Sequence, residues 1–284
     1  RMRLVGATAF RNAALLEQQA KEFAPDWILL GDSASAAAIN SGVLPSNTAL
    51  HAGDEHLDRL IRSEGVDTVV SAVVGAAGLK STWIAVDAGK RVALANKESL
   101  VVAGAIIRQR AAETGAAIIP VDSEHSAIFQ ALQAGKKHDL RRIILTASGG
   151  PFRGWSKSKM RDVTPEMALK HPTWDMGPKI TIDSATMMNK ALEIIEARWL
   201  FDIPADQISV VVHPQSIIHS FVEYRDGSVI SQMSPPDMRL PIQYALTYPD
   251  RISCPSADTD WTAATIMELF PPDLDAFPAL GLGF

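Results

Sequence analysis

The sequence predicts an α/β protein in which a parallel-sheet domain, of the kind that binds nucleotides, precedes a second, α+β domain. In the first part of the chain, short apolar runs alternate with stretches of helical periodicity, which is the pattern of βαβ units. After about residue 124 this alternation stops, and a long irregular stretch separates the remaining elements. A length of 284 residues is comfortable for two domains of roughly 100–200 residues each.

The predicted strands of the first domain are apolar runs bounded by glycine, aspartate or asparagine. Helices are expected between them, over 12–23, where Leu16, Ala20 and Phe23 share one face, and over 54–64. The strands are Leu4–Thr8, Trp27–Leu30, Thr68–Val74, Val92–Ala95 and Ala116–Val121.

In the second domain we expect strands over 142–146, 208–212 and 228–232. A further strand should follow Lys179 and lead into a helix over about 185–200. The proline-rich tail beyond Pro249 reads as an extended connector.

Composition excludes several classes of protein. A hydrophobic fraction of 47%, a charged fraction of 21% and a net charge of −5 leave no basic excess for nucleic acid. The single cysteine, Cys254, fits a reducing compartment. No run approaches the roughly 18 apolar residues of a membrane span, and the chain does not start with a secretory signal. We therefore expect a cytosolic protein without a membrane or nucleic-acid partner.

Two carboxylates close the last strand of the first domain. Asp122 and Glu124 are two positions apart, so on an extended segment both point to the same side and can bind one hard divalent cation such as Mg²⁺ or Mn²⁺. The alternative is that Asp122 or Ser123 only caps a helix that starts near Glu124.

The helix over 185–200 offers a third acidic ligand. A core-facing stripe of Met188, Leu192, Ile195 and Trp199 is predicted, with the polar side chains on a neighbouring face at spacings of three and four. Those side chains are Asn189, Lys190 and Glu193. A solvated Lys190–Glu193 pair is the alternative, and Glu196 fits the same role, so spacing does not choose between the two glutamates.

Two segments can hold an anion. Asp183 and Ser184 precede the helix, whose first backbone N–H groups can bind phosphate together with Asn189 and Lys190. Ser148-Gly149-Gly150 follows a strand, and glycines let backbone amides approach an anion. Simple capping and a simple turn are the respective alternatives.

Two more groups of residues are candidates for ligand contact. The segment His171–Pro178, with Trp174 and Met176, can close over a small ligand, or can be a packed loop with Trp174 buried. His213 and His219 flank a turn, and an isolated histidine is more often structural than catalytic.

A dinucleotide site is indicated less directly. The segment 71–78 follows a strand and opens a helix, but the G-x-G-x-x-G fingerprint is absent from the chain. Arg11-Asn12 follows the first strand and can select an adenosine 2′-phosphate, unless it is only a surface arginine beside a helix cap. The segment 95–99 ends another strand, where open α/β sheets bind ligands.

Taken together, six strings resemble the motifs of 1-deoxy-D-xylulose 5-phosphate reductoisomerases, in the same order. These strings are 94–100, 122–125, 148–152, 171–177, 183–193 and 213–220. The resemblance runs from about residue 3 to the end. It implies an NADPH- and metal-dependent enzyme that converts 1-deoxy-D-xylulose 5-phosphate to 2-C-methyl-D-erythritol 4-phosphate for isoprenoid precursors.

The resemblance also implies residue roles. Asp122, Glu124 and Glu193 would bind Mn²⁺, Mg²⁺ or Co²⁺, which decides against Glu196. The sugar-phosphate residues would be Ser123, Glu124, Ser148, His171, Trp174, Met176, Ser184, Asn189, Lys190 and Glu193, with Lys97, Glu124, His171 and His219 acting in catalysis. The NADPH residues would be Arg11, Asn12, Val73, Gly75, Ala95, Asn96, Lys97, Glu98 and Gly177.

By the same resemblance, residues 1–122 form an incomplete Rossmann-like NADPH domain, 123–250 the catalytic domain and 251–284 a connector. A glycine-rich βα unit before Leu4 and a C-terminal helical domain after Phe284 would be missing, so we expect a fragment that is inactive alone. The family suggests a homodimer in the bacterial cytoplasm or the plastid stroma.

Overall fold

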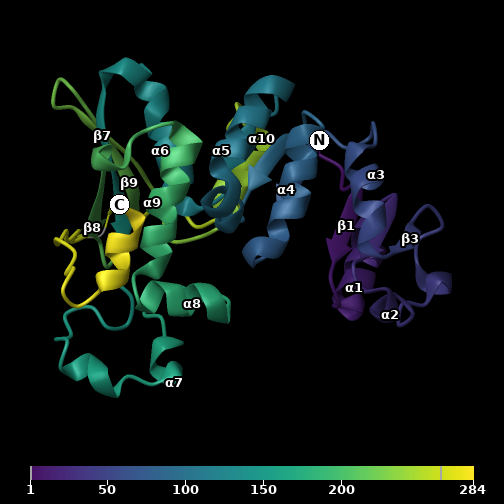
Figure 1. The fold of residues 1–284 in the computed structure, drawn as a ribbon, viewed down its shortest axis with the longest axis horizontal. Helices are drawn as coiled ribbons and strands as arrows, with labels where there is room; N and C mark the ends of the chain where they lie inside the picture. The colour runs from purple at the N-terminus through teal and green to yellow at the C-terminus, as the bar shows by residue number, and fades with distance from the viewer. Residues whose placement is uncertain (1, 263) are drawn as a thin grey trace.

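The computed structural model describes residues 2–262 and 264–284 and confirms the α/β class (Figure 1). The N-terminal part contains six short parallel strands linked by helices. Its strands are β1 Gly6–Ala9, β2 Trp27–Leu30, β3 Ala49–Ala52, β4 Thr68–Ser71, β5 Arg91–Leu94 and β6 Ile118–Pro120. Its helices are α1 Ala13–Phe23, α2 Ser33–Ala36, α3 Leu57–Arg62, α4 Gly78–Asp87 and α5 Lys97–Thr114.

These six strands form two three-stranded parallel sheets, in the orders β1-β2-β3 and β4-β5-β6. Within each sheet, successive strands are neighbours, and Trp27 pairs with both Gly6 and Ala49. The strand predictions in this part are correct to within three residues at each end, but β3 is missed because Ala49–Ala52 is short and none of its side chains is fully buried. A helix is present at 54–64, although it begins with a 3₁₀ turn at Asp54–His56.

The second part is built on a four-stranded mixed sheet in the order β10-β9-β7-β8. Its strands are β7 Leu140–Ala147, β8 Ile208–Val212, β9 Ile218–Tyr224 and β10 Val229–Met233. Its helices are α6 Ser123–Ala131, α7 Pro165–Ala168, α8 Pro178–Ala185, α9 Met188–Phe201 and α10 Arg239–Thr247. The sequence predictions omit β9, because polar side chains such as His219, Ser220 and Glu223 are buried along it and hide the apolar pattern.

Two predictions around α9 are wrong. The segment after Lys179 is the helix α8 rather than a strand, since Pro178 occupies a first helical position. The predicted core stripe of Met188, Leu192, Ile195 and Trp199 is only partly buried, whereas Glu193, Ile194 and Glu196 are buried. The side of α9 that faces the interior therefore includes Glu193 and Glu196. These charged residues are tolerated there because they have charged partners.

The two parts are joined through α5 and α9, which pack against each other. Gly104 of α5 lies against Trp199 of α9, so closely that a Cβ at Gly104 would fall 2.3 Å from the indole ring. The tail is not only an extended connector. It returns to α9, beside which the 3₁₀ segment Pro278–Gly283 lies (Figure 1), and buries Phe277 and Leu280 in the core of the second part.

None of the described helices is long and apolar enough to cross a membrane.

Candidate active site

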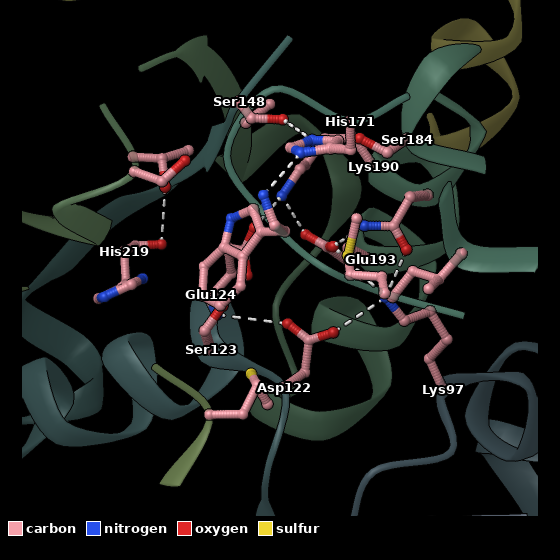
Figure 2. A pocket seen from close by; sticks show the side chains of 18 of the residues that line it. Lys97, Asp122, Ser123, Glu124, Ser148, His171, Ser184, Lys190, Glu193 and His219 are labelled. Carbon is pink, nitrogen blue, oxygen red and sulfur yellow. Dashed lines mark hydrogen bonds and ion pairs between the residues drawn. The ribbon is translucent and has the colours of Figure 1, made fainter. Parts of the chain in front are cut away.

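Three carboxylates from separate positions in the chain meet in one place. Asp122 follows β6, Glu124 lies in the first turn of α6, and Glu193 lies on α9. Each offers an oxygen atom, and these atoms lie within 4.8 Å of one another (Figure 2). Asp122 also accepts a hydrogen bond from the Glu124 backbone N–H at 3.3 Å. The helix cap that the sequence left as an alternative is thus formed by the same side chain that faces the cluster.

Two buried lysines balance these carboxylates. The Lys97 ammonium lies 2.9 Å from Asp122 Oδ2, 3.4 Å from Glu193 Oε1 and 2.6 Å from Asn189 Oδ1. The Lys190 ammonium donates to Glu124 Oε1 at 2.7 Å and to Glu193. Burial lowers the pKa of both lysines, but the carboxylates around them outweigh it and raise each pKa above its ordinary value. Both lysines are therefore charged.

The donor set fits a hard divalent cation. Burial, and then the charge of Glu124, raise the pKa of Glu193 to about 7 even though Lys190 and Lys97 lower it, so a further positive charge is needed to keep Glu193 fully ionised. Carboxylate oxygens gathered at this separation are the ligands that Mg²⁺ and Mn²⁺ prefer. A cation there would favour the charged form of all three acids.

A second group, Asp122, His125 and Glu196, meets the same distance criterion but fits a cation less well. Burial lowers the pKa of His125, yet the charges of Glu196 and Asp122 raise it to about 9. A protonated imidazole has no lone pair for a metal. His125 Nδ1 instead faces Asp122 at 3.4 Å and Glu196 at 3.5 Å, which makes this group an internal charge network behind the acidic cluster.

The opposite end of the cavity presents neutral donors. His171 Nδ1 accepts hydrogen bonds from the backbone N–H of Thr173 at 3.1 Å and Trp174 at 2.9 Å. Its Nε2 must then carry the proton and donate to Ser148 Oγ at 2.9 Å. This neutral form agrees with a pKa of His171 that burial lowers.

Two glycines shape this end. Gly149 and Gly150 both have positive φ, and a Cβ at Gly150 would lie 2.7 Å from the Ser184 carbonyl oxygen. Ser184 is in the last turn of α8. The helix predicted over 185–200 is α9, which begins only at Met188, after Met187 in the left-handed region. The predicted placement of Ser184 directly before the first backbone N–H groups of this helix is therefore wrong, and so is the alternative that Asp183 or Ser184 caps it.

Of the two histidines that flank the turn after β8, only one faces the cavity. His219 lines it, and its ring centroid lies 6.4 Å from that of Trp174. Its Nε2 bonds to Ser234, and burial lowers its pKa. His213 donates from Nδ1 to the Glu268 carbonyl at 2.9 Å and accepts a hydrogen bond from the Ile217 N–H at Nε2. Both of its ring nitrogens therefore form hydrogen bonds that stabilise the fold.

The cavity of about 230 Å³ therefore combines an acidic end, at Asp122 and Glu193, with an end that presents the neutral side chains of Ser148 and His171 (Figure 2). It brings together all of the predicted metal- and substrate-binding residues. These are Lys97, Asp122, Ser123, Glu124, Ser148, His171, Trp174, Met176, Ser184, Asn189, Lys190, Glu193 and His219, with Ala95 beside them. The predictions missed Thr146, Asp175, Ile180, Met187, Ser216, Ile218 and Met238, which also line it. No local pattern marks Met238, because it follows β10 and reaches the site only through the fold.

Of the predicted cofactor residues, Ala95 and Lys97 line this cavity, and the others lie outside it. Asn96 caps α5 and donates through Nδ2 to the carbonyl groups of Val73 at 2.7 Å and Gly75 at 2.9 Å, which fixes the loop after β4. Arg11 is exposed, 3.7 Å from Asp32, and Asn12 caps α1. Glu98 lies in the first turn of α5, and Gly177 is the residue directly before α8.

Family models match most of the chain. A model described as 1-deoxy-D-xylulose 5-phosphate reductoisomerase matches residues 1–104, one for the C-terminal domain of the same enzyme matches 118–201, and one described as DXP reductoisomerase C-terminal domain matches 233–284.

Curated relatives and solved structures agree. The reductoisomerase of Rhodopirellula baltica is 53% identical and that of Chlorobium phaeobacteroides 52%, over 88% and 99% of this chain. The chain spans 63% and 74% of their respective lengths. A crystal structure of DOX-P reductoisomerase with NADPH, fosmidomycin and magnesium has a TM-score of 0.93 at 44% identity, and the Zymomonas mobilis enzyme with NADPH has 0.91 at 44%. The chain is covered completely in both, with 72% and 73% of the other chain.

Proposed function

Because this chain belongs to the 1-deoxy-D-xylulose 5-phosphate reductoisomerase family, we propose that the protein it represents rearranges and reduces 1-deoxy-D-xylulose 5-phosphate to 2-C-methyl-D-erythritol 4-phosphate, with NADPH as the reductant. The observation that carries the proposal is the cavity in which three convergent carboxylates lie opposite the serine, histidine and glycine cradle. One end suits a cation and the other a phosphate ester, so a sugar phosphate can span them.

We propose Asp122, Glu124 and Glu193 as the residues that hold Mn²⁺, Mg²⁺ or Co²⁺. When bound there, the cation would polarise the oxygens of the substrate and stabilise the charge that develops as the carbon skeleton rearranges. Lys97 remains beside Asp122 and, with Ser123, faces the reacting carbons. His125 and Glu196 keep the carboxylate of Asp122 oriented from behind.

The phosphate is assigned to Ser148, Ser184, Asn189 and Lys190. Lys190 contacts Glu124 and Glu193 in this structure, so this role requires its ammonium to turn toward the phosphate once other positive charge neutralises the glutamates. Neutral His171 already donates to Ser148 and can donate to a phosphate oxygen from the same Nε2. Trp174 and Met176, in the segment that ends at Gly177, would cover the substrate and exclude water.

Hydride transfer needs the nicotinamide at the carboxyl ends of β4 and β5. We assign its binding to Val73, Gly75 and Asn96, with Ala95, Lys97, Glu98 and Gly177 nearby, and the 2′-phosphate to Arg11 and Asn12. The support is the hydrogen bonding of Asn96 to the loop after β4 at the edge where open sheets bind nucleotides. His219, neutral and beside Trp174, would contact the substrate from the β9 side.

The test follows NADPH oxidation by absorbance at about 340 nm, with the sugar phosphate and Mn²⁺ or Mg²⁺ present. We expect oxidation only when substrate and cation are both added. Consumption of the sugar phosphate without NADPH oxidation would instead favour a metal-dependent isomerase or aldolase. If Glu193→Gln changed neither turnover nor ligand binding, a non-catalytic fragment would be favoured.

We also propose a homodimer, as the family resemblance suggests. The outer strand β10 leaves one edge of the mixed sheet open, with Val229 51% exposed. Light scattering of the purified protein would test the dimer. The relatives named above are bacterial, and a cytoplasmic location, or a plastid one in a plant, stays a prediction.

A further inference from the structure

A lysine outside the cavity contacts both parts of the proposed active site. Lys179 lies in the first turn of α8, and its Nζ is 2.8 Å from Glu98 Oε1 on α5 and 2.7 Å from Asp183 Oδ2 on its own helix. It is absent from the residues that line the cavity. Its ion pair with Glu98 therefore joins the cofactor side to the helix that carries Ser184.

On the cofactor side, the contact continues to the loop after β4. Glu98 Oε2 accepts from Asn96 Nδ2 at 3.0 Å, and the same amide nitrogen donates to the Val73 and Gly75 carbonyls. Asn96 is 3% exposed, and its Oδ1 accepts the Ser99 backbone N–H at 2.9 Å. A Cβ at Gly78 would lie 2.7 Å from the same side chain. Packing and hydrogen bonds therefore fix Asn96, so a shift of the loop has to move Glu98 as well.

On the substrate side, Lys179 lies where the segment 171–177 meets α8. The segment 171–177, whose Trp174 lines the cavity, ends directly before α8, and Ser184 lies at the other end of that helix against Gly150. The pair with Asp183, one turn along the helix, holds the Lys179 side chain in place. A displacement of α8 therefore changes both the covering segment and one wall of the phosphate cradle.

We infer that Lys179 is a positioning residue that couples NADPH binding to sugar-phosphate binding, by tying the loop after β4 to α8. This inference rests on the proposed function. Binding of the nicotinamide would fix the loop, Asn96 and Glu98, and through Lys179 it would hold α8 in the position in which Ser184 meets the phosphate. Coupling of this kind is reciprocal, so each ligand should tighten the binding of the other by the same factor.

The environment of the pair sets the size of the effect. The side chains of Glu98 and Asp183 are only 18% exposed, whereas that of Lys179 is 47% exposed. Burial raises the pKa of Glu98, but the hydrogen bond from Lys179, a backbone hydrogen bond and the charges of Lys179 and Lys97 together outweigh it, and the pKa is lowered. Partly exposed pairs of this kind contribute little to stability, and they correspond to a factor of about two to five in an equilibrium constant.

The experiment measures the dissociation constant of NADPH with and without 1-deoxy-D-xylulose 5-phosphate, in EDTA so that no turnover occurs. The ratio of the two constants is the coupling factor. We expect Lys179→Met to reduce this factor by about two- to fivefold, and Lys179→Arg to restore it because arginine keeps the charge. Lys21→Met is the matched control, since Lys21 also pairs with a carboxylate four residues away and is also 47% exposed.

Two results would overturn the inference while leaving the proposed function in place: an unchanged coupling factor in Lys179→Met, or an equal loss in Lys21→Met. If the protein without substitutions bound neither NADPH nor the sugar phosphate, the proposed function would be overturned, and the inference with it. Because Lys179 is half exposed, Lys179→Met should unfold at the temperature of the parent, which a thermal scan checks.

Discussion

Replacement of Lys97 by methionine isolates the contribution of one buried cation to the acidic cluster. Lys97 Nζ lies 2.9 Å from Asp122 Oδ2 and 3.4 Å from Glu193 Oε1, and its side chain is 7% exposed. Methionine keeps most of the volume but leaves the carboxylates short of a counter-charge. Loss of one partner from a buried pair costs about 3–5 kcal/mol, and Glu193 retains Lys190, so we expect the free energy of unfolding to fall by about 3 kcal/mol.

The assay is urea unfolding of parent and variant, in EDTA and then in saturating Mn²⁺. Ligand at about 1,000 times its dissociation constant stabilises a folded protein by about 4 kcal/mol, so Mn²⁺ should offset the loss in Lys97→Met. Adding Asp122→Asn removes both members of the pair. The double variant should therefore be more stable than Lys97→Met in EDTA, and Mn²⁺ should no longer rescue it.

Two outcomes would refute this reasoning. One is a Lys97→Met protein as stable as the parent in EDTA, which would mean that the lysine does not offset the buried carboxylates. The other is a double variant no more stable than Lys97→Met, which would assign the loss to packing rather than to charge.

Two further predictions concern contacts that join elements across the molecule. Gly104→Ala places a Cβ 2.3 Å from the Trp199 ring, so thermal unfolding should show a loss of about 1–3 kcal/mol, and an unchanged midpoint would mean that α5 and α9 separate easily. Hydrogen bonds from Arg108 and Lys137 lower the pKa of Asp202 to about 2, below its unfolded value, so its contribution to stability is present above pH 4 and is lost as the pH falls toward 2. Asp202→Asn should thus cost less than about 1 kcal/mol at pH 7, because the side chain is 48% exposed, and nothing at pH 2; a difference that persists at pH 2 would contradict the ion-pair explanation.

The sequence predicted the elements whose local pattern is unambiguous. Short, largely apolar strands such as Trp27–Leu30 and Ile208–Val212 are found with the predicted bounds, since apolar runs between turn residues leave little choice. The split of the parallel strands into two sheets was not predictable in this way, because strand order depends on pairing between distant segments. β9 was missed because it buries polar residues whose partners lie on other elements, as His219 bonds to Ser234 and Glu223 pairs with Arg142.

The acidic cluster, too, could be predicted from the sequence only in part. The pairing of Asp122 with Glu124 could be read from their spacing, although Glu124 lies on a helix rather than on an extended segment. The choice between Glu193 and Glu196 could not be made from spacing, since both are buried and three residues apart on α9. Their partners, Lys190 and His125, become visible only in three dimensions.

The most direct test of the proposed metal site is therefore Mn²⁺ binding by Glu193→Gln and Glu196→Gln, measured by calorimetry or electron paramagnetic resonance. Removal of a residue that orients a ligand costs about 10–100-fold in affinity, and removal of a ligand costs more. We predict that Glu193→Gln weakens Mn²⁺ binding by more than about 100-fold, while Glu196→Gln weakens it by about tenfold or less. A larger loss in Glu196→Gln would place the cation among Asp122, His125 and Glu196 and would contradict the proposed site.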